Sequence, residues 1–342
     1  MKAQTPPPFL RSPATYVVAE AEINHNGDPD IALRMVDAAR AAGADAVKFQ
    51  YVVAAEIATP DSPFYALFKG VELDQSAFRR IMDHATAAGL DCFLTVPSLG
   101  TLAPVLALQP PMLKIGSTNL TNLPLLAEIG RTGLPVLLST GLGTLGEVEA
   151  ALEALQATPE RVGLFHCAVK YPAPAAILNL RAISTMQAAF PGYAIGFSDH
   201  SEGEVAAVAA VALGARMVEK HFTLDRAMQG PDHSFSTDPE GFRRLVVAIR
   251  DTEAALGDGT KRPSAEELPM VKGARRYVVA AKPLQRGRPI PADALTARRI
   301  TADRDGMEPA LAARIAGWPA PRDYAVGEPL CWSDFASGGQ AE

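Results

Sequence analysis

The chain has 342 residues and a formal net charge of −6 at pH 7. Its acidic and basic side chains are interspersed, which argues against a surface that binds nucleic acid or another polyanion. No run of about 18 uninterrupted apolar residues is present, and the N-terminus lacks an apolar signal segment, so we expect a cytoplasmic protein without a membrane span.

Strand-like apolar runs alternate with helical patterns along most of the chain. The expected strands lie at residues 16–22, 46–50, 92–97, 112–117, 135–140, 162–167, 194–200 and 217–223. The helical patterns include residues 30–42, 74–88, 122–131, 144–155, 180–190, 202–213 and 240–256. Eight strands that each precede a helical stretch predict an α/β fold of the (β/α)₈ TIM-barrel type.

The composition changes after the last of these helices. A barrel over residues 15–257 accounts for most of the length, because such barrels use about 250 residues. The next residues are hydrophilic, so residues 258–273 are expected to form a linker. Short apolar runs then predict a small β-rich module over residues 274–340.

Polar side chains gather at the predicted carboxyl ends of seven of the eight strands. In a TIM barrel these ends meet at one rim, which carries the active site. The candidate residues, in chain order, are Glu20, Lys48, Gln50, Lys114, Ser117, Asn119, Ser139, Tyr171, Ser198, His200 and His221.

Two histidines in this set suggest a metal. His200 and His221 close two neighbouring strands joined by a predicted crossover helix, and a βαβ unit places such strand ends side by side. Two neutral imidazoles with a carboxylate nearby suit a divalent first-row metal. A single histidine of this kind is often structural, so the interpretation depends on the combination of residues.

The lysines and hydroxyls suggest the substrate. Lys48 and Lys114, with Ser117 and Ser139, would supply charge and hydrogen-bond donors for a phosphate or carboxylate group. The substrates implied are an anionic phosphorylated donor and a polyol or carbonyl acceptor. A lone lysine is usually a solvated charge, and again it is the whole group that favours a functional site.

Several segments together resemble the sialic acid synthase (N-acetylneuraminate synthase) family. The resemblance runs from about residue 16 to the C-terminus. It is carried by AEAEINHNG at 19–27, ADAVKFQ at 44–50, KIGS at 114–117, LSTG at 138–141, FSDH at 197–200, VEKHF at 218–222 and GPDH at 230–233.

The resemblance implies a reaction. The family condenses phosphoenolpyruvate with an aldose such as N-acetylmannosamine, and it forms a nine-carbon 2-keto acid and phosphate. It implies that His200 and His221 bind Mn²⁺, with Mg²⁺ or Co²⁺ as alternatives, and that Glu20 positions or deprotonates the attacking water. The phosphoenolpyruvate pocket would comprise Lys48, Lys114, Ser117, Ser139 and Ser198, and the acceptor side Gln50, Tyr171 and Asp232.

The chain departs from the family pattern at four places. Asn119 stands where Glu or Asp is usual, so a catalytic acid–base role there is in question. Val96 removes a hydroxyl, Val169 replaces a polar residue, and Glu22 stands where glycine is frequent. Two alternatives therefore stay open: a related phosphoenolpyruvate-using aldol-type enzyme with another acceptor, and a catalytically weakened carbohydrate-binding homologue.

The C-terminal module resembles the antifreeze-like SAF domain that ends chains of this family. In the family this domain reaches over the barrel of a partner subunit, and an arginine contacts the sugar there. The resemblance assigns that role to Arg299, beside Arg298, and implies a domain-swapped homodimer.

Overall fold

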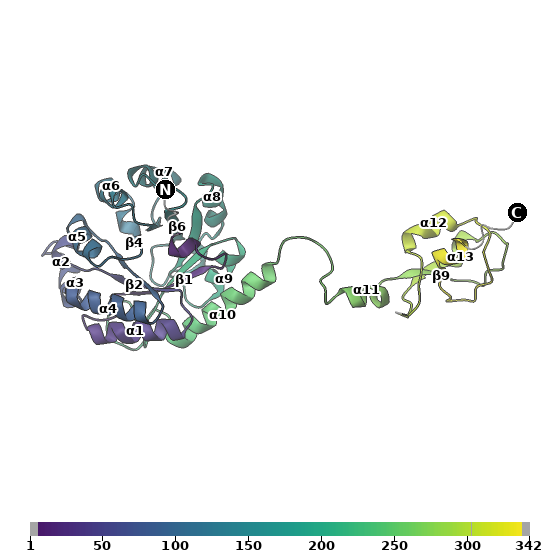
Figure 1. Ribbon diagram of the computed structural model, residues 1–342, viewed down its shortest axis with the longest axis horizontal. Helices are drawn as coiled ribbons and strands as arrows, with labels where there is room; N and C mark the ends of the chain where they lie inside the picture. Colours follow the sequence, from purple (N-terminus) through teal and green to yellow (C-terminus); the bar gives the residue numbers. More distant parts are fainter. Residues whose placement is uncertain (1–5, 302, 337–342) are drawn as a thin grey trace. The chain divides into compact units, whose positions relative to one another are not determined.

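The computed structural model describes residues 6–301 and 303–336. The chain divides into two compact units, the first ending at Asp258 and the second beginning at Gly259. Both are drawn in Figure 1. Within the described residues, no helix combines the length and the apolar character that a membrane crossing needs.

The first unit is a closed barrel of eight parallel strands in sequential order. This confirms the predicted TIM barrel. The strands are β1 (Tyr16–Glu22), β2 (Ala46–Gln50), β3 (Asp91–Thr95), β4 (Leu113–Ile115), β5 (Val136–Ser139), β6 (Val162–Cys167), β7 (Ala194–Asp199) and β8 (Met217–His221). The barrel closes through pairing of β1 with β8, in which Glu20 lies opposite His221.

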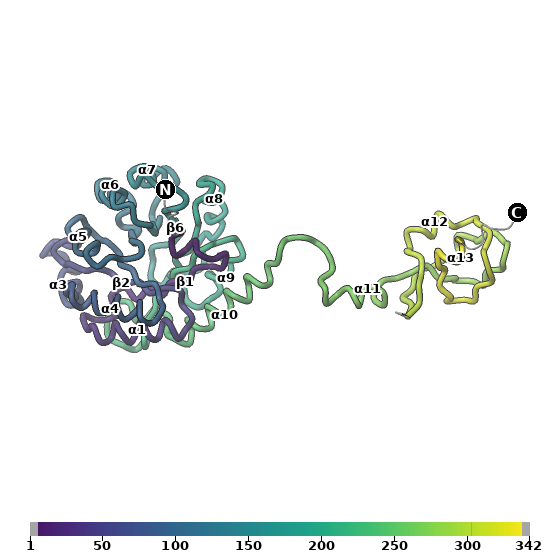
Figure 2. Tube along the Cα trace, viewed as in Figure 1, coloured from purple at the N-terminus to yellow at the C-terminus, as the bar shows by residue number. Residues whose placement is uncertain are grey.

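Helices surround these strands (Figure 2). They are α1 (Pro29–Ala41), α4 (Gln75–Ala87), α5 (Leu99–Ala107), α6 (Leu123–Arg131), α7 (Leu145–Ala154), α8 (Arg181–Ala189), α9 (Val205–Ala212) and α10 (Pro239–Leu256). Two short helices, α2 (Ala54–Ile57) and α3 (Tyr65–Gly70), lie in the connection from β2 to α4. The helical patterns expected from the sequence did not include α2, α3 or α5.

Helix α5 is absent from the sequence-based helices because its own residues obscure it. It contains Pro104, which removes a backbone donor and disfavours a helix interior. A capping box at Ser98 and Thr101 nevertheless starts the helix, and Val105 is buried against the barrel. Tertiary packing therefore outweighs the local propensity here.

Three predicted strands were too long by two residues at their carboxyl ends, including the eighth, which was expected to reach residue 223 but ends at His221. The third was expected to reach residue 97 but β3 ends at Thr95, and the fourth was expected to reach residue 117 but β4 ends at Ile115. The residues beyond β4 turn into the 3₁₀ helix η2 (Ser117–Asn119). The chain therefore leaves the β-sheet at the carboxyl end of the barrel. There Ser117 and Asn119 line a pocket instead of pairing with a neighbouring strand.

Side chains alternate along each strand between two packed regions. One side packs against the helices in a large apolar core. The other fills the amino-terminal half of the barrel interior, where Phe9 from the 3₁₀ helix η1 (Pro8–Leu10) joins strand residues such as Phe93, Phe165 and Met217. The barrel is therefore solid at this end, and polar residues occupy its carboxyl end.

The second unit has its own small core. Strands β9 (Tyr277–Ala280) and β10 (Leu295–Arg298) form an antiparallel pair, with α12 (Ala312–Ile315) and α13 (Trp332–Ala336) in the same unit. Buried Val278, Ile290, Ile315, Tyr324 and Leu330 belong to this core. Helix α11 (Leu268–Ala274) occupies the end of the segment expected to be a linker, and residues 337–340 of the expected module lie outside the described residues.

Candidate functional site

A polar pocket of about 120 Å³ lies at the carboxyl ends of the barrel strands. It brings together eleven of the residues proposed from the sequence: Glu20, Lys48, Gln50, Lys114, Ser117, Asn119, Ser139, Tyr171, Ser198, His200 and His221. Glu22, Thr95, Cys167, Val169 and Glu219 line the same pocket. The strand-end rule thus gathers residues that are up to 201 positions apart in the chain.

One end of the pocket is built from two buried lysines. Lys48 forms an ion pair with Glu20. The Lys114 ammonium donates to Ser139 Oγ at 2.6 Å and lies 3.6 Å from Glu219 Oε1, and Lys48 Nζ lies 3.9 Å from Glu219 Oε2. We call this group, with Ser198, the lysine end of the pocket.

Glu219 is the centre of the lysine end, and the site residues proposed from the sequence did not include it. Ser198 Oγ donates to its Oε1 at 2.8 Å. Burial alone would raise the pKa of Glu219, but the attraction of Lys114 and Lys48 outweighs burial and lowers it. The period of two along β8 could have indicated Glu219, because it shares a strand face with His221.

Burial acts on the lysines in the opposite direction. It lowers the pKa of Lys48 to about 7, and Lys114 adds to this effect while Glu219 opposes it. The charge of Lys48 therefore depends on the nearby carboxylate of Glu219.

The other end of the pocket holds the two histidines, with ring centroids 5.3 Å apart. His200 Nδ1 bonds to the carbonyl oxygen of Ala168 at 2.7 Å, and Nε2 lies 3.4 Å from Ser198 Oγ. Burial lowers the pKa of both imidazoles, so they are neutral near pH 7. Neutral imidazole is the form that binds metal.

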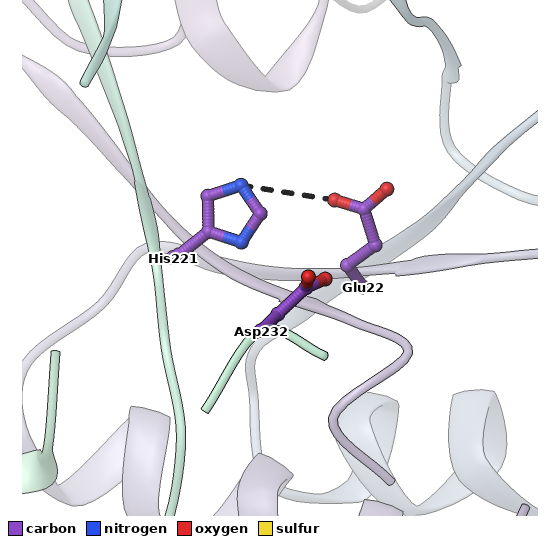
Figure 3. Close-up of side chains that lie close together, drawn as sticks. All are labelled: Glu22, His221 and Asp232. Atoms are coloured by element: carbon purple, nitrogen blue, oxygen red, sulfur yellow. Dashed lines mark ion pairs between the residues drawn. The ribbon is translucent and has the colours of Figure 1, made fainter. Parts of the chain in front are cut away.

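His221 also belongs to a compact group with two carboxylates. One ligand atom each from Glu22, His221 and Asp232 lies within 4.8 Å of the others. Figure 3 shows both carboxylates close to the imidazole, Glu22 from the end of β1 and Asp232 from the loop after β8. We call these three residues with His200 the histidine end. The sequence placed Asp232 on the acceptor side and did not include Glu22 among the site residues.

The carboxylates in this group have raised pKa values. Burial, with repulsion from Asp232 and Glu219, raises the pKa of Glu22 to about 8, and burial raises that of Asp232 to about 6. His221 Nδ1 is buried and has no hydrogen-bond partner among the described residues. A divalent cation fits these donors: it would give His221 a partner and offset the carboxylate repulsion.

The other pocket residues differ in how many of their polar atoms already form hydrogen bonds within the protein. The Tyr171 ring lies 4.2 Å from that of His200, between centroids. Ser117 Oγ accepts from the Gly141 amide at 3.0 Å. Asn119 uses both ends of its amide, donating to the Pro97 carbonyl at 2.9 Å and accepting from Asn122 at 3.0 Å. Asn119 therefore lines the pocket mainly as a structural residue.

Arg299 belongs to the second unit. It follows β10 directly and, like its neighbour Arg298, is exposed to solvent.

The fold and the pocket define a (β/α)₈-barrel protein with a buried lysine–carboxylate cluster and a histidine–carboxylate group at one rim. The NeuB family model matches residues 35–261. The chain belongs to this family, which confirms the resemblance to sialic acid synthases.

Named relatives span several products. The chain is 36% identical to the N,N′-diacetyllegionaminic acid synthase of Campylobacter jejuni, over 83% of this chain and 90% of that protein. It is 30% identical to the human N-acetylneuraminate-9-phosphate synthase, over 83% and 82%. The solved N-acetylneuraminic acid synthetase of Leptospira borgpetersenii superposes with a TM-score of 0.72 at 32% identity, covering 76% of this chain and 90% of that one.

Proposed function

We propose that this protein condenses phosphoenolpyruvate with N-acetylmannosamine or a related aldose, and with water, to give a nine-carbon 2-keto acid of the sialic acid type and phosphate. The observation that carries the proposal is the pocket itself. It places two lysines with hydroxyl groups at one end and two neutral histidines with carboxylates at the other. Family membership supports the same chemistry.

The lysine end suits phosphoenolpyruvate. Lys48 and Lys114 would contact its phosphate and carboxylate, with Ser117, Ser139 and Ser198 donating hydrogen bonds. Both lysines are already balanced by Glu20 and Glu219. The bound anion would therefore share them with these carboxylates, and the buried pairs would hold both ammonium groups in place before the substrate arrives.

The bond changes follow from the substrates. C3 of phosphoenolpyruvate forms a bond to the aldehyde carbon, and the aldehyde oxygen takes up a proton. Water adds at C2, and the bond from C2 to the phosphate oxygen then breaks, which releases phosphate and leaves the keto group. Glu20, held by Lys48 and by the Glu22 amide at 2.9 Å, would accept the proton of the attacking water.

A divalent metal would be held by His200 and His221 and would polarise the aldehyde as a Lewis acid. We propose Mn²⁺, with Mg²⁺ or Co²⁺ as alternatives. The donor set supports this assignment, because His200 bonds through Nδ1 to a backbone carbonyl and keeps Nε2 available as a ligand.

The acceptor sugar would lie against Gln50, Tyr171 and Asp232. We propose that the second unit is a SAF domain and that Arg299 of the partner subunit completes this side in a domain-swapped homodimer. A guanidinium suits the task because its rigid fork can donate to several sugar oxygens at once.

The test is a product analysis. Purified protein with Mn²⁺ and phosphoenolpyruvate is incubated with a panel of aldoses that includes N-acetylmannosamine, and phosphate release is followed together with product mass. We expect release to require an aldose, and the product mass to equal that of the aldose plus pyruvic acid. Phosphate release that is independent of aldose would contradict a synthase, and no release with any aldose would favour a weakened carbohydrate-binding homologue.

A second candidate differs only in the acceptor. Val169 lines the pocket where the family pattern has a polar residue, which favours a sugar with different substituents. A named relative makes N,N′-diacetyllegionaminic acid, whose name denotes two acetamido groups. A diacetamido aldose belongs in the panel, and a higher kcat/KM for it than for N-acetylmannosamine would select this candidate.

A further inference from the structure

Glu22 has an unusual backbone conformation. Its φ is +41°, in the left-handed region that favours glycine. The pairing of β1 with β2 shifts register between Glu20 and Glu22, so Ala21 is an extra residue in this strand. Such bulges re-aim a side chain and are over-represented beside active sites. Non-glycine residues held in this conformation also concentrate at functional sites.

The bulge directs the Glu22 carboxylate into the pocket. Its Oε2 lies 3.8 Å from His221 Nε2 (Figure 3). Neither Glu22 nor Asp232 forms an ion pair with a lysine or arginine within residues 6–301 and 303–336. The imidazole beside them is only 5% exposed, and its Nδ1 has no hydrogen-bond partner in the same part of the chain.

The charges of the pocket leave these carboxylates unbalanced. At the lysine end, Lys48 and Lys114 face Glu20 and Glu219, so two cations meet two anions. At the histidine end, Glu22 and Asp232 in their ionised forms would place two negative charges beside the neutral His221 imidazole, without an ion pair to a lysine or arginine in the described part of the chain. An anionic substrate entering this pocket would add further negative charge. A divalent cation at the histidine end would compensate the negative charge of the two carboxylates and that of the substrate.

We infer that Glu22 is itself a ligand of the metal, and that with His221 and Asp232 it forms a three-donor site that binds a divalent cation before any substrate is present. This inference depends on the metal of the proposed function but goes beyond the two histidines assigned there. Carboxylate oxygen and imidazole nitrogen together suit Mn²⁺, which accepts both. The three donors come from β1, β8 and the following loop, so the cation would also tie these segments together.

The experiment measures binding in the absence of phosphoenolpyruvate and aldose. The full-length protein is freed of metal with a chelator and titrated with Mn²⁺, with calorimetry and the electron paramagnetic resonance of free Mn²⁺ as readouts. Wild-type protein is expected to bind Mn²⁺. Glu22→Gln, which keeps the size of the side chain, should weaken binding at least about tenfold, since changes that only support a ligand already cost 10–100-fold.

Two further variants separate a ligand from a structural residue. Glu22→Gly suits the positive φ, so its melting temperature should equal or exceed that of the wild type while Mn²⁺ affinity falls as in Glu22→Gln. Glu202→Gln is the matched control: this carboxylate is 66% exposed, pairs with Arg226, and is not part of the pocket. It should bind Mn²⁺ like the wild type.

The inference is overturned if wild-type protein binds no Mn²⁺ without substrates, or if both Glu22 variants bind it as tightly as the wild type. Its failure is distinguishable from that of the proposed function. A protein could form the keto acid in the product assay and still show no effect of Glu22 on Mn²⁺ binding. Conversely, the Glu22 variants could lose Mn²⁺ affinity in a protein that forms no keto acid.

Discussion

The two ends of the pocket are both polar and buried, yet they are organised in opposite ways. At the lysine end each ammonium group contacts a carboxylate, and Glu219 and Ser139 also engage hydroxyl or ammonium donors. At the histidine end two carboxylates and a buried imidazole converge without a cation among the described residues. The charges at the lysine end are paired with one another, whereas the histidine end has carboxylate oxygens and an imidazole nitrogen that could still bind a cation.

This difference shows where substrate and metal would act. A balanced network of buried charges is rigid, because each partner lost would leave another charge unpaired. It can present its lysines to an anion without rearranging. A cluster of unbalanced donors is instead completed by what binds to it, so binding and function should both depend steeply on residues at that end.

The largest expected effect comes from removing an imidazole at the histidine end. His221→Ala should nearly abolish turnover and lower Mn²⁺ affinity by more than about 100-fold, because losing a ligand exceeds the cost of losing its supporting contacts. Calorimetry and steady-state kinetics measure the two effects. His84→Ala is the control, since this exposed histidine pairs with Asp37 on the outer helices. Unchanged metal content and activity in His221→Ala would show that the metal lies elsewhere.

Glu20→Gln tests the lysine end. The amide still can accept from the Glu22 backbone but loses the charge beside Lys48. We expect a rate loss on the order of 10²–10⁴, the range for a lost general acid or base. The kcat of phosphate release measures it, with exposed Glu240→Gln as control. If only KM changed, Glu20 would act through substrate binding and not through proton transfer.

Subunit mixing asks whether the acceptor side is completed by another chain. Inactive His200→Ala and inactive Arg299→Ala proteins are mixed under conditions that permit exchange. A mixed dimer would pair an intact barrel from the second variant with an intact C-terminal unit from the first, so partial activity should return. No recovery despite demonstrated exchange would contradict an arginine acting between subunits.

The smallest effect is expected at Asn119. Its amide donates to the Pro97 carbonyl, and Asn119→Asp removes that donor, at a cost to the free energy of unfolding of about 1 kcal/mol. The rate should change far less than the range on the order of 10²–10⁴ expected at Glu20. Thermal unfolding and kcat test both statements. A variant several orders of magnitude faster would mark the parent as a weakened enzyme.

Much of the architecture could be predicted from local patterns. Apolar runs and the helical repeats between them were sufficient for the barrel, and all eight strands begin within one residue of the expected start and end within two of the expected end. The rule that polar residues gather at carboxyl strand ends brought Lys48, Lys114, His200 and His221 into one pocket. These features depend on short-range sequence order.

Other features depend on which segments meet in space. Alternation along β8 shows that Glu219 shares a face with His221, but only the closed barrel places it between Lys48 and Lys114. The contact of Glu22 with His221 needs a bulge in β1 and the pairing of β1 with β8, neither of which a single strand's pattern encodes. Local order along the chain therefore specifies the repeat and the residue types at the rim. Which charges are balanced depends on the closed barrel, because pairing depends on distances between segments far apart in the chain.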